Sequence, residues 1–270
     1  MSAMAAAMDR TRRNLPRYLG VIPVAALAVL IGALRLGADR VQIVEPPFLL
    51  PILNTLFLFL MPCVVAFLAL RSYRISGSLP LLMLGSGVLT FGLGSLVAGW
   101  LIGAYGPNAT VTVHNASSLL ASLFHIAGIA AAASDAPPEA DPRRRKERMA
   151  AAYGCVALFV VLLALAAVQG ITPKFFIQGV GPTPIRQAIL AITLLCFGVS
   201  SAYMMARFFQ RAASFLYWYS LALALLAVGM AGIFLQSAVG GPVGWLARIA
   251  QYLAGVYFLV AVVSAYREGK

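Results

Sequence analysis

Both histidines of the chain, His114 and His125, lie in the stretch Val111–Gly128, which is otherwise apolar or small. Eleven steps along a helix bring the two rings to within about 20° of one face and about 16 Å apart along the axis. Ser118 lies close to the same line, so this face is expected to contact protein rather than lipid. Such rings can donate hydrogen bonds to carbonyl groups of neighbouring helices, sense pH, contact a ligand, or bind a metal or haem. Their separation excludes one metal site shared by both rings.

A second group of polar residues is expected toward the outer leaflet. Arg248 forms a polar helix face with Gln251 at i+3, and Glu45 precedes another apolar run on the same side. Arg248 and Glu45 could form an ion pair, or Arg248 could hold an anionic or carbonyl-bearing ligand. Asn54 and Asn115 add amides at a similar depth, which predicts a cleft there. The candidate sensing or ligand-binding residues are therefore His114, Asn115, Ser118, His125, Asn54, Arg248, Gln251 and Glu45.

The sequence lacks the motifs of the common reaction types. All eight acids lie in loops or at the edges of apolar runs, whereas an ion-coupled transporter usually needs a carboxylate within a span. The lysines also lie outside the runs, which excludes a retinal Schiff base. There is no HExxH zinc motif and no phosphate-binding P-loop. We therefore expect no enzyme activity, no catalytic residue, no cofactor and no metal.

Long apolar segments must position these residues. The chain has 270 residues, of which 61% are hydrophobic and 10% are charged, a composition foreign to water-soluble domains. Each run is long enough to cross a hydrocarbon layer of ~30 Å as a helix. The expected fold is all-α, a polytopic membrane bundle of eight transmembrane helices. The runs are 18–36, 48–70, 79–105, 111–133, 150–169, 184–207, 213–237 and 243–266.

The basic residues predict the orientation of these spans. With the N-terminus inside, fifteen Lys and Arg residues fall on the cytoplasmic side and five on the other. Both termini are then cytoplasmic, in the inner (plasma) membrane of a prokaryotic cell. The net charge of +12 reflects this topology and contact with anionic lipid, so no nucleic-acid partner is expected. The predicted segments are a cytoplasmic tail (1–17), a four-span half (18–133), a basic cytoplasmic linker (134–149), a second four-span half (150–266) and a cytoplasmic end (267–270).

The two halves share an internal similarity. With a shift of 133 residues, Pro51 falls on Pro184 and Cys63 falls on Cys196. Because four spans is an even number, such halves would be parallel repeats about an axis along the membrane normal. This 4+4 arrangement predicts two helix layers with a cleft between them.

Three stretches carry a resemblance to a known family. They are EPPFLLPILNTLFLFLMPCVVAFLALRSYRISGSLPLLMLGSGVLTFGLGSLVAGWL, VTVHNASSLLASLFHIAG and GPVGWLARIAQYLAGVYFLVAVVSAYRE. Together they resemble the multi-span N-terminal sensor modules of prokaryotic PAS-domain histidine kinases, similar in kind to membrane-associated sensor (MASE-type) domains. The resemblance covers roughly 45–133 and 241–268. It carries no ligand and no functional residues to this chain.

The resemblance implies an integral membrane sensor that feeds a cytoplasmic PAS and kinase output, with a homodimer if a kinase is fed. The sequence departs from that pattern at Lys270, where it stops without a catalytic histidine box or an ATP site. Any kinase activity would therefore lie outside these residues, in a further domain or in a partner protein.

The sequence thus predicts a membrane-embedded sensory or signal-input module. A stimulus at the outer polar residues would shift the helix packing, and the last span would pass the displacement inward. A small-solute or lipid transporter is one alternative, favoured by the repeat and the cleft but disfavoured by the lack of carboxylates within the spans. A haem- or quinone-binding membrane protein is another.

Overall fold

The computed structural model is 88% helical. It describes residues 3–37, 46, 48–134, 137–177, 180–236 and 240–268, with the backbone alone for 3–18, 37 and 268. Two short strands, β1 (Phe176–Ile177) and β2 (Gly181–Pro182), pair as an antiparallel hairpin between α5 and α6. The helices are α1 (Ala3–Gly37), α2 (Leu49–Leu53), the π-helix η1 (Asn54–Leu60), α3 (Met61–Ser76), α4 (Leu79–Ala133), α5 (Pro142–Val168), α6 (Pro184–Arg211), α7 (Ser214–Leu235) and α8 (Pro242–Glu268).

Within the described residues, seven helical segments are long and apolar enough to cross a membrane. One of these is the continuous run of α2, η1 and α3 from Leu49 to Ser76. Large apolar side chains such as Val29, Phe67 and Leu195 are more than half exposed, on surfaces that water would disfavour and lipid would accept. These features indicate a multi-pass, all-α membrane protein, in agreement with the predicted fold class.

The longest helix, α4, folds back on itself at Gly106. This residue has φ 74° and ψ −176°, outside the helical region, and Pro107 follows as a good first residue for a new helix. A Cβ on Gly128 would lie 3.2 Å from the Cβ atom of Met83, whereas 45 residues of straight helix would hold the two about 68 Å apart. α4 is therefore a hairpin of two helical arms, which correspond to the predicted runs 79–105 and 111–133.

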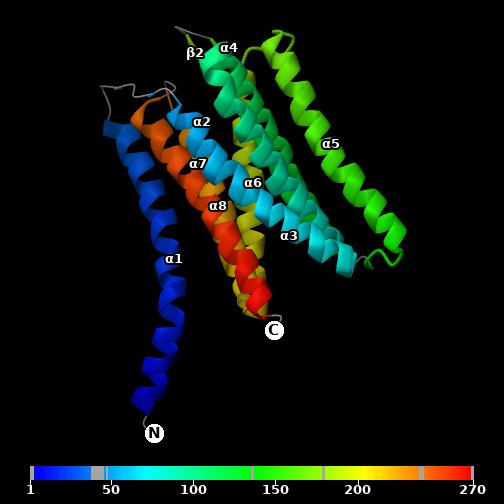
Figure 1. Cartoon of the computed structure of the whole chain (residues 1–270). Helices are drawn as coiled ribbons and strands as arrows, with labels where there is room; N and C mark the ends of the chain where they lie inside the picture. The colour runs from blue at the N-terminus through cyan, green and yellow to red at the C-terminus, as the bar shows by residue number, and fades with distance from the viewer. Residues whose placement is uncertain are drawn as a thin grey trace.

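The helices lie side by side in a bundle with two distinct ends (Figure 1). The end drawn at the top, here the upper end, holds the β hairpin and the bend of α4. The lower end holds the link between α4 and α5 and the C-terminus of α8. α4 and α7 form the centre of the bundle, and 67% of the residues in an apolar 18-residue stretch of each are buried. The same fraction is 17% for α1 and for α5 at the periphery. The main apolar core joins α3, α4, α6, α7 and α8.

The basic run that follows the α4–α5 link is helical. Asp141 caps the start of α5 by accepting a 2.8 Å hydrogen bond from the backbone N–H of Arg143, and Pro142 stands at the first helical position. Residues 143–148, which belong to the predicted linker 134–149, therefore form the first turns of α5. The Asp141 cap and Pro142 at the first helical position favour helix formation, although the run that follows them is charged and solvated.

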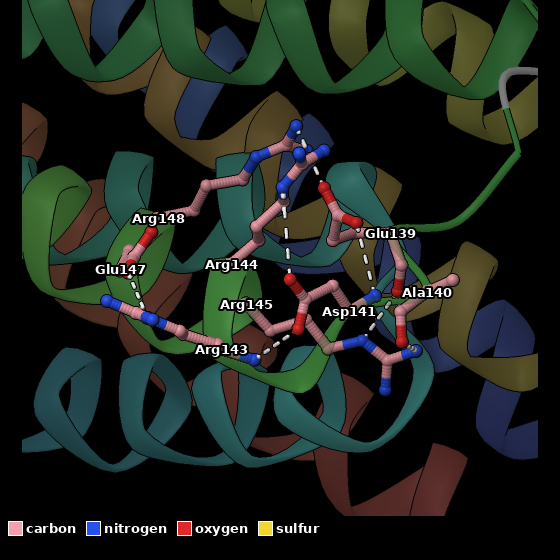
Figure 2. A network of polar contacts seen from close by, with 8 residues as sticks. All are labelled: Glu139, Ala140, Asp141, Arg143, Arg144, Arg145, Glu147 and Arg148. Carbon is pink, nitrogen blue, oxygen red and sulfur yellow. Dashed lines mark hydrogen bonds and ion pairs between the residues drawn. The ribbon is translucent and has the colours of Figure 1, made fainter.

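The link is also fastened to the end of α3, and its contacts with the first turns of α5 are drawn in Figure 2. Arg145 donates a 2.7 Å hydrogen bond to the carbonyl of Ile75, and the N–H of Glu139 donates to the carbonyl of Gly77 at 3.0 Å. The Arg148 guanidinium pairs with the Glu139 carboxylate at 3.0 Å. These contacts hold the lower ends of the two halves of the chain together.

Two further predictions concern the first helix and the halves. The backbone of α1 begins at Ala3, so this helix includes most of the segment predicted as a tail, 1–17. The 133-residue repeat and the sidedness of the bundle stay predictions.

Candidate functional site

A small cavity lined by polar and apolar side chains lies at the upper end, between the start of η1, the bend of α4, the end of α7 and the start of α8. Its volume is about 50 Å³, which is room for roughly three to five water molecules. We call it the upper cavity. Five of the predicted site residues line it: Asn54, His114, Asn115, Arg248 and Gln251.

Asn54 is held in place from two sides. Its Nδ2 donates a 2.9 Å hydrogen bond to the carbonyl of Ser95 on α4, and its Oδ1 accepts one of 3.1 Å from the hydroxyl of Tyr252 on α8. The residue opens the π-helix η1, a wider helical turn of a kind that often occurs at functional sites. The amide therefore fixes the spacing of three elements around the cavity.

His114 comes from the second arm of α4. Its Nδ1 lies 3.3 Å from the hydroxyl oxygen of Ser95 on the first arm, and the edge of the Phe91 ring packs against it. The sequence suggested a carbonyl partner, but the structure supplies a hydroxyl group. Ser118 lies one turn further on, where its hydroxyl donates to the carbonyl of His114 at 2.7 Å, so Ser118 supports the helix and does not line the cavity.

Two amides of the upper cavity have N–H groups to spare. Asn115 and Gln251 are each 1% exposed, and within the described part of the chain neither Asn115 Nδ2 nor Gln251 Nε2 has a hydrogen-bond partner. A buried donor left unpaired costs about 1–3 kcal/mol, so native structures rarely contain one without a reason. A bound water molecule or ligand in the cavity would satisfy both.

Two guanidinium groups add positive charge to this region. Arg248 on α8 lines the cavity, with its Cζ atom 4.7 Å from the centre of the Trp245 ring. Arg186 on α6 is fully buried, and its Nη2 donates to the carbonyl of Ile233, a lining residue, at 3.1 Å.

The described part of the chain places its acidic side chains at the opposite end of the bundle. The acidic side chains it describes are Glu139, Asp141 and Glu147, all near the lower end. The predicted set of site residues does not include Arg186. An arginine inside an apolar run, two residues after Pro184, is the sequence feature that indicates it. The predicted Glu45 lies outside the described residues, so its pairing with Arg248 stays a prediction.

His125 belongs to a different place from the rest of the predicted set. It is 2% exposed, and its Nδ1 lies 2.6 Å from the hydroxyl of Tyr219 on α7. It lines a much larger lower cavity of about 550 Å³ that reaches the lower end of the bundle. Between the two cavities, His125 and Gln251 line a third space of about 10 Å³, close to the minimum for one water molecule.

Comparison of the chain with protein-family models, curated proteins and solved structures finds no match. The chemistry of the site is therefore judged from its geometry. The upper cavity combines N–H donors with the Arg248 guanidinium in a space of a few atoms. Such an arrangement suits the binding of a small anion or a carbonyl oxygen.

Proposed function

We propose that the chain is an eight-span sensory module whose upper cavity binds a small anion. The two arms of α4 are each long enough to cross a ~30 Å hydrocarbon layer, and together with the six other apolar segments they make eight crossings. The basic run 143–148 at the lower end supports a cytoplasmic position for that end. The upper cavity would then face the outer leaflet.

One observation carries this proposal: the upper cavity presents two buried, unpaired amide N–H groups beside a guanidinium group. Asn115 Nδ2 and Gln251 Nε2 offer N–H groups, and Arg248 offers charge. The volume of about 50 Å³ fits a halide, nitrate, formate or acetate ion. A haem or a quinone ring is far larger, since sites for such ligands span about 300–1,000 Å³.

The last helix supports the sensory part of the proposal. α8 contributes Arg248 and Gln251 to the upper cavity and runs from there to the lower end at Glu268. An anion that draws these two side chains together would favour one position of α8 over another. A cytoplasmic PAS or kinase domain, or a partner protein, would read the shift at the lower end, and a homodimer would allow two such helices to act together.

Binding is tested on the full chain in an uncharged detergent. The thermal unfolding midpoint is measured in chloride, nitrate, formate or acetate, with gluconate as a bulky balancing anion at constant ionic strength. We expect at least one small anion to raise the midpoint, since a ligand at 100 times its Kd adds about 2.7 kcal/mol to stability. Arg248→Gln should abolish the rise, whereas Arg35→Gln, which removes an exposed charge from the upper end of α1, should preserve it. Equal midpoints in all five salts would refute anion binding.

The sensory role is tested separately from binding. The chain is fused to a kinase output domain, and phosphorylation is measured in membranes with the anion that stabilises the protein. We expect the anion to change phosphorylation at least several-fold, and Arg248→Gln to remove the response. An anion that binds without changing the output of the fusion would leave the site in place and reject the sensory role.

A transporter is the second candidate, because three spaces follow one another through the bundle. Gln251 lines both the upper cavity and the 10 Å³ space, and His125 lines both that space and the lower cavity. A small anion could follow this route if Gln251 and His125 moved apart. Flux of the bound anion into liposomes that contain the protein would favour transport over sensing, and impermeable liposomes would reject it.

A further inference from the structure

The lower cavity is a separate space whose lining changes character along its length. Its walls come from the lower ends of both arms of α4, the end of α6, the start of α7 and the link at Pro138. Along α6 it extends from Arg211 to Tyr203, eight residues or about 12 Å. The volume of about 550 Å³ lies within the range of sites for ligands the size of a drug molecule.

The mouth of the lower cavity is basic. Arg207 and Arg211 line it near the C-terminal end of α6, where Arg207 donates one hydrogen bond to Gln210 at 3.2 Å. The described carboxylates of the link, Glu139 and Asp141, and that of Glu147 in α5 pair with arginines of α5, as Figure 2 shows. None of these three lines the cavity. The charge at the mouth therefore lacks an acidic counterpart in the described part of the chain.

The interior of the lower cavity combines apolar side chains with one polar pair. Leu84, Met204 and Phe215 contribute apolar side chains, and the buried His125 and Tyr219 are joined by their 2.6 Å contact. Within the described residues, His125 Nε2 has no hydrogen-bond partner. A ligand that fits must therefore have a negative group at one end and an apolar body.

We infer that the lower cavity binds an anionic amphiphile, with its phosphate or carboxylate between Arg207 and Arg211 and its apolar body between α4 and α7. Arginine suits this role because its planar, forked donors match the oxygen atoms of either group. Two sources share this chemistry: an acidic phospholipid of the adjacent leaflet and a soluble cytoplasmic amphiphile. The inference does not depend on the upper cavity or on the sensory role.

The test uses the full chain, released from an uncharged detergent and examined by native mass spectrometry. The lipid probes are phosphatidylglycerol and phosphatidylcholine, and the soluble probes are hexyl phosphate and inorganic phosphate. We expect the protein to retain phosphatidylglycerol, hexyl phosphate or both roughly tenfold better than the matched probe that lacks the net charge or the apolar chain. Retention of phosphatidylglycerol alone indicates a lipid source, and retention of hexyl phosphate alone indicates a soluble one.

Three variants distinguish binding in the lower cavity from attraction to positive charge elsewhere on the surface. Arg207→Gln with Arg211→Gln should reduce retention about tenfold, whereas Arg143→Gln with Lys146→Gln removes the same charge from exposed positions of α5 and should have no effect. Ala132→Phe keeps both arginines but fills the apolar part of the cavity, and should also reduce retention. The inference is overturned if Arg207→Gln with Arg211→Gln retains the probes as well as Arg143→Gln with Lys146→Gln does. It is also overturned if Ala132→Phe binds as the wild type does while its unfolding midpoint shows that it is folded, or if neither charged amphiphile is preferred to its matched probe.

Discussion

The amide of Gln251 illustrates the tension between stability and binding in this molecule. Its Nε2 is buried at 1% exposure without a partner among the described residues, and it lines both the upper cavity and the small space beside His125. A side chain selected only for packing at this position would be apolar. An unpaired donor is instead what a site needs in order to bind an acceptor.

We predict that Gln251→Met stabilises the protein without ligand while weakening anion binding. Methionine is similar in size and has no buried N–H group to desolvate, so the free energy of unfolding should rise by about 1 kcal/mol. The rise of the thermal midpoint caused by the anion should fall at the same time. Both quantities can be measured in mixed micelles with increasing sodium dodecyl sulfate.

Gln169→Met provides the control for that variant. Gln169 is exposed at the end of α5, so its replacement should change the free energy of unfolding by less than about 0.5 kcal/mol. A loss of more than 1 kcal/mol in Gln251→Met would mean that the amide has a partner and is part of the packing.

The residues of the upper cavity were partly predictable, because position along a helix gives depth in a membrane. Counting from the ends of the apolar runs placed Asn54, Asn115 and Arg248 at one level, and the structure brings them to one cavity. The same reasoning put His114 and His125 on one helix face. It also placed them about 16 Å apart along the helix axis. It could not show which space each ring meets, since that depends on which helix lies opposite at that depth.

At the scale of elements, the two arms of α4 approach each other closely. A Cβ on Gly94 would lie 2.2 Å from the Cβ atom of Ser117, so any side chain there pushes the arms apart. Small residues allow such close approach of helices in membranes, where packing drives association. The separation of the arms in turn sets the position of His114 against Ser95.

We therefore predict that Gly94→Ala destabilises the protein by about 1–3 kcal/mol through overpacking. Gly103→Ala, on the same arm, meets nothing within 4 Å and should be neutral or slightly stabilising, because alanine favours helices. Unfolding in mixed micelles measures both. Adding Ser117→Gly should restore much of the loss in Gly94→Ala, and a failure of that rescue would place the clash elsewhere.

The link between the halves gives a second prediction at this scale. Arg145 joins the link and α3 by donating to the carbonyls of Glu139 and Ile75 at 2.5 and 2.7 Å. Arg145→Gln should loosen the link and speed its cleavage by proteinase K about tenfold, the effect of about 1.4 kcal/mol. Arg143→Gln removes only an exposed ion pair with Glu147 and should leave the rate unchanged. Equal cleavage rates in the two variants would mean that Arg145 does not hold the link.

The helices themselves were largely predictable, whereas their packing was not. Hydropathy and length identify a run as apolar, and the pair Gly106–Pro107 marks a turn, so each predicted run has a helix or an arm that matches it. Hydropathy does not separate the central α7 from the peripheral α5, since both are strongly apolar. The burial of α7 depends on small residues such as Gly229 and Gly232, which lie against α8, and on partners that only the fold reveals.

At the scale of the whole molecule, the side of the membrane that each end of the bundle faces determines which ligands can reach each cavity. The lower end carries the basic run 143–148 and the basic mouth of the lower cavity, and the upper end carries Arg186 and Arg248 inside the protein. If the lower end is cytoplasmic, as the positive-inside rule predicts, the proposed anion would reach the upper cavity from outside the cell and the proposed amphiphile would reach the lower cavity from within.

We predict that single cysteines will report this arrangement in intact cells. In a variant without Cys63, Cys155 and Cys196, an impermeant maleimide should label Ala104→Cys near the bend of α4 and Val180→Cys at the β hairpin. It should label Ala140→Cys, in the link, only after the cells are permeabilised. This labelling pattern would mean that each arm of α4 crosses the membrane once.

Two other labelling patterns would change the interpretation in defined ways. Labelling of Ala140→Cys but not of Val180→Cys in intact cells would invert the bundle, so that the upper cavity would meet cytoplasmic anions and the sensory proposal would concern an internal signal. Ala104→Cys with the same accessibility as Ala140→Cys would mean that the arm 79–105 does not cross. The count of eight would then fail, because both arms of a helical hairpin must cross together for its ends to return to one side.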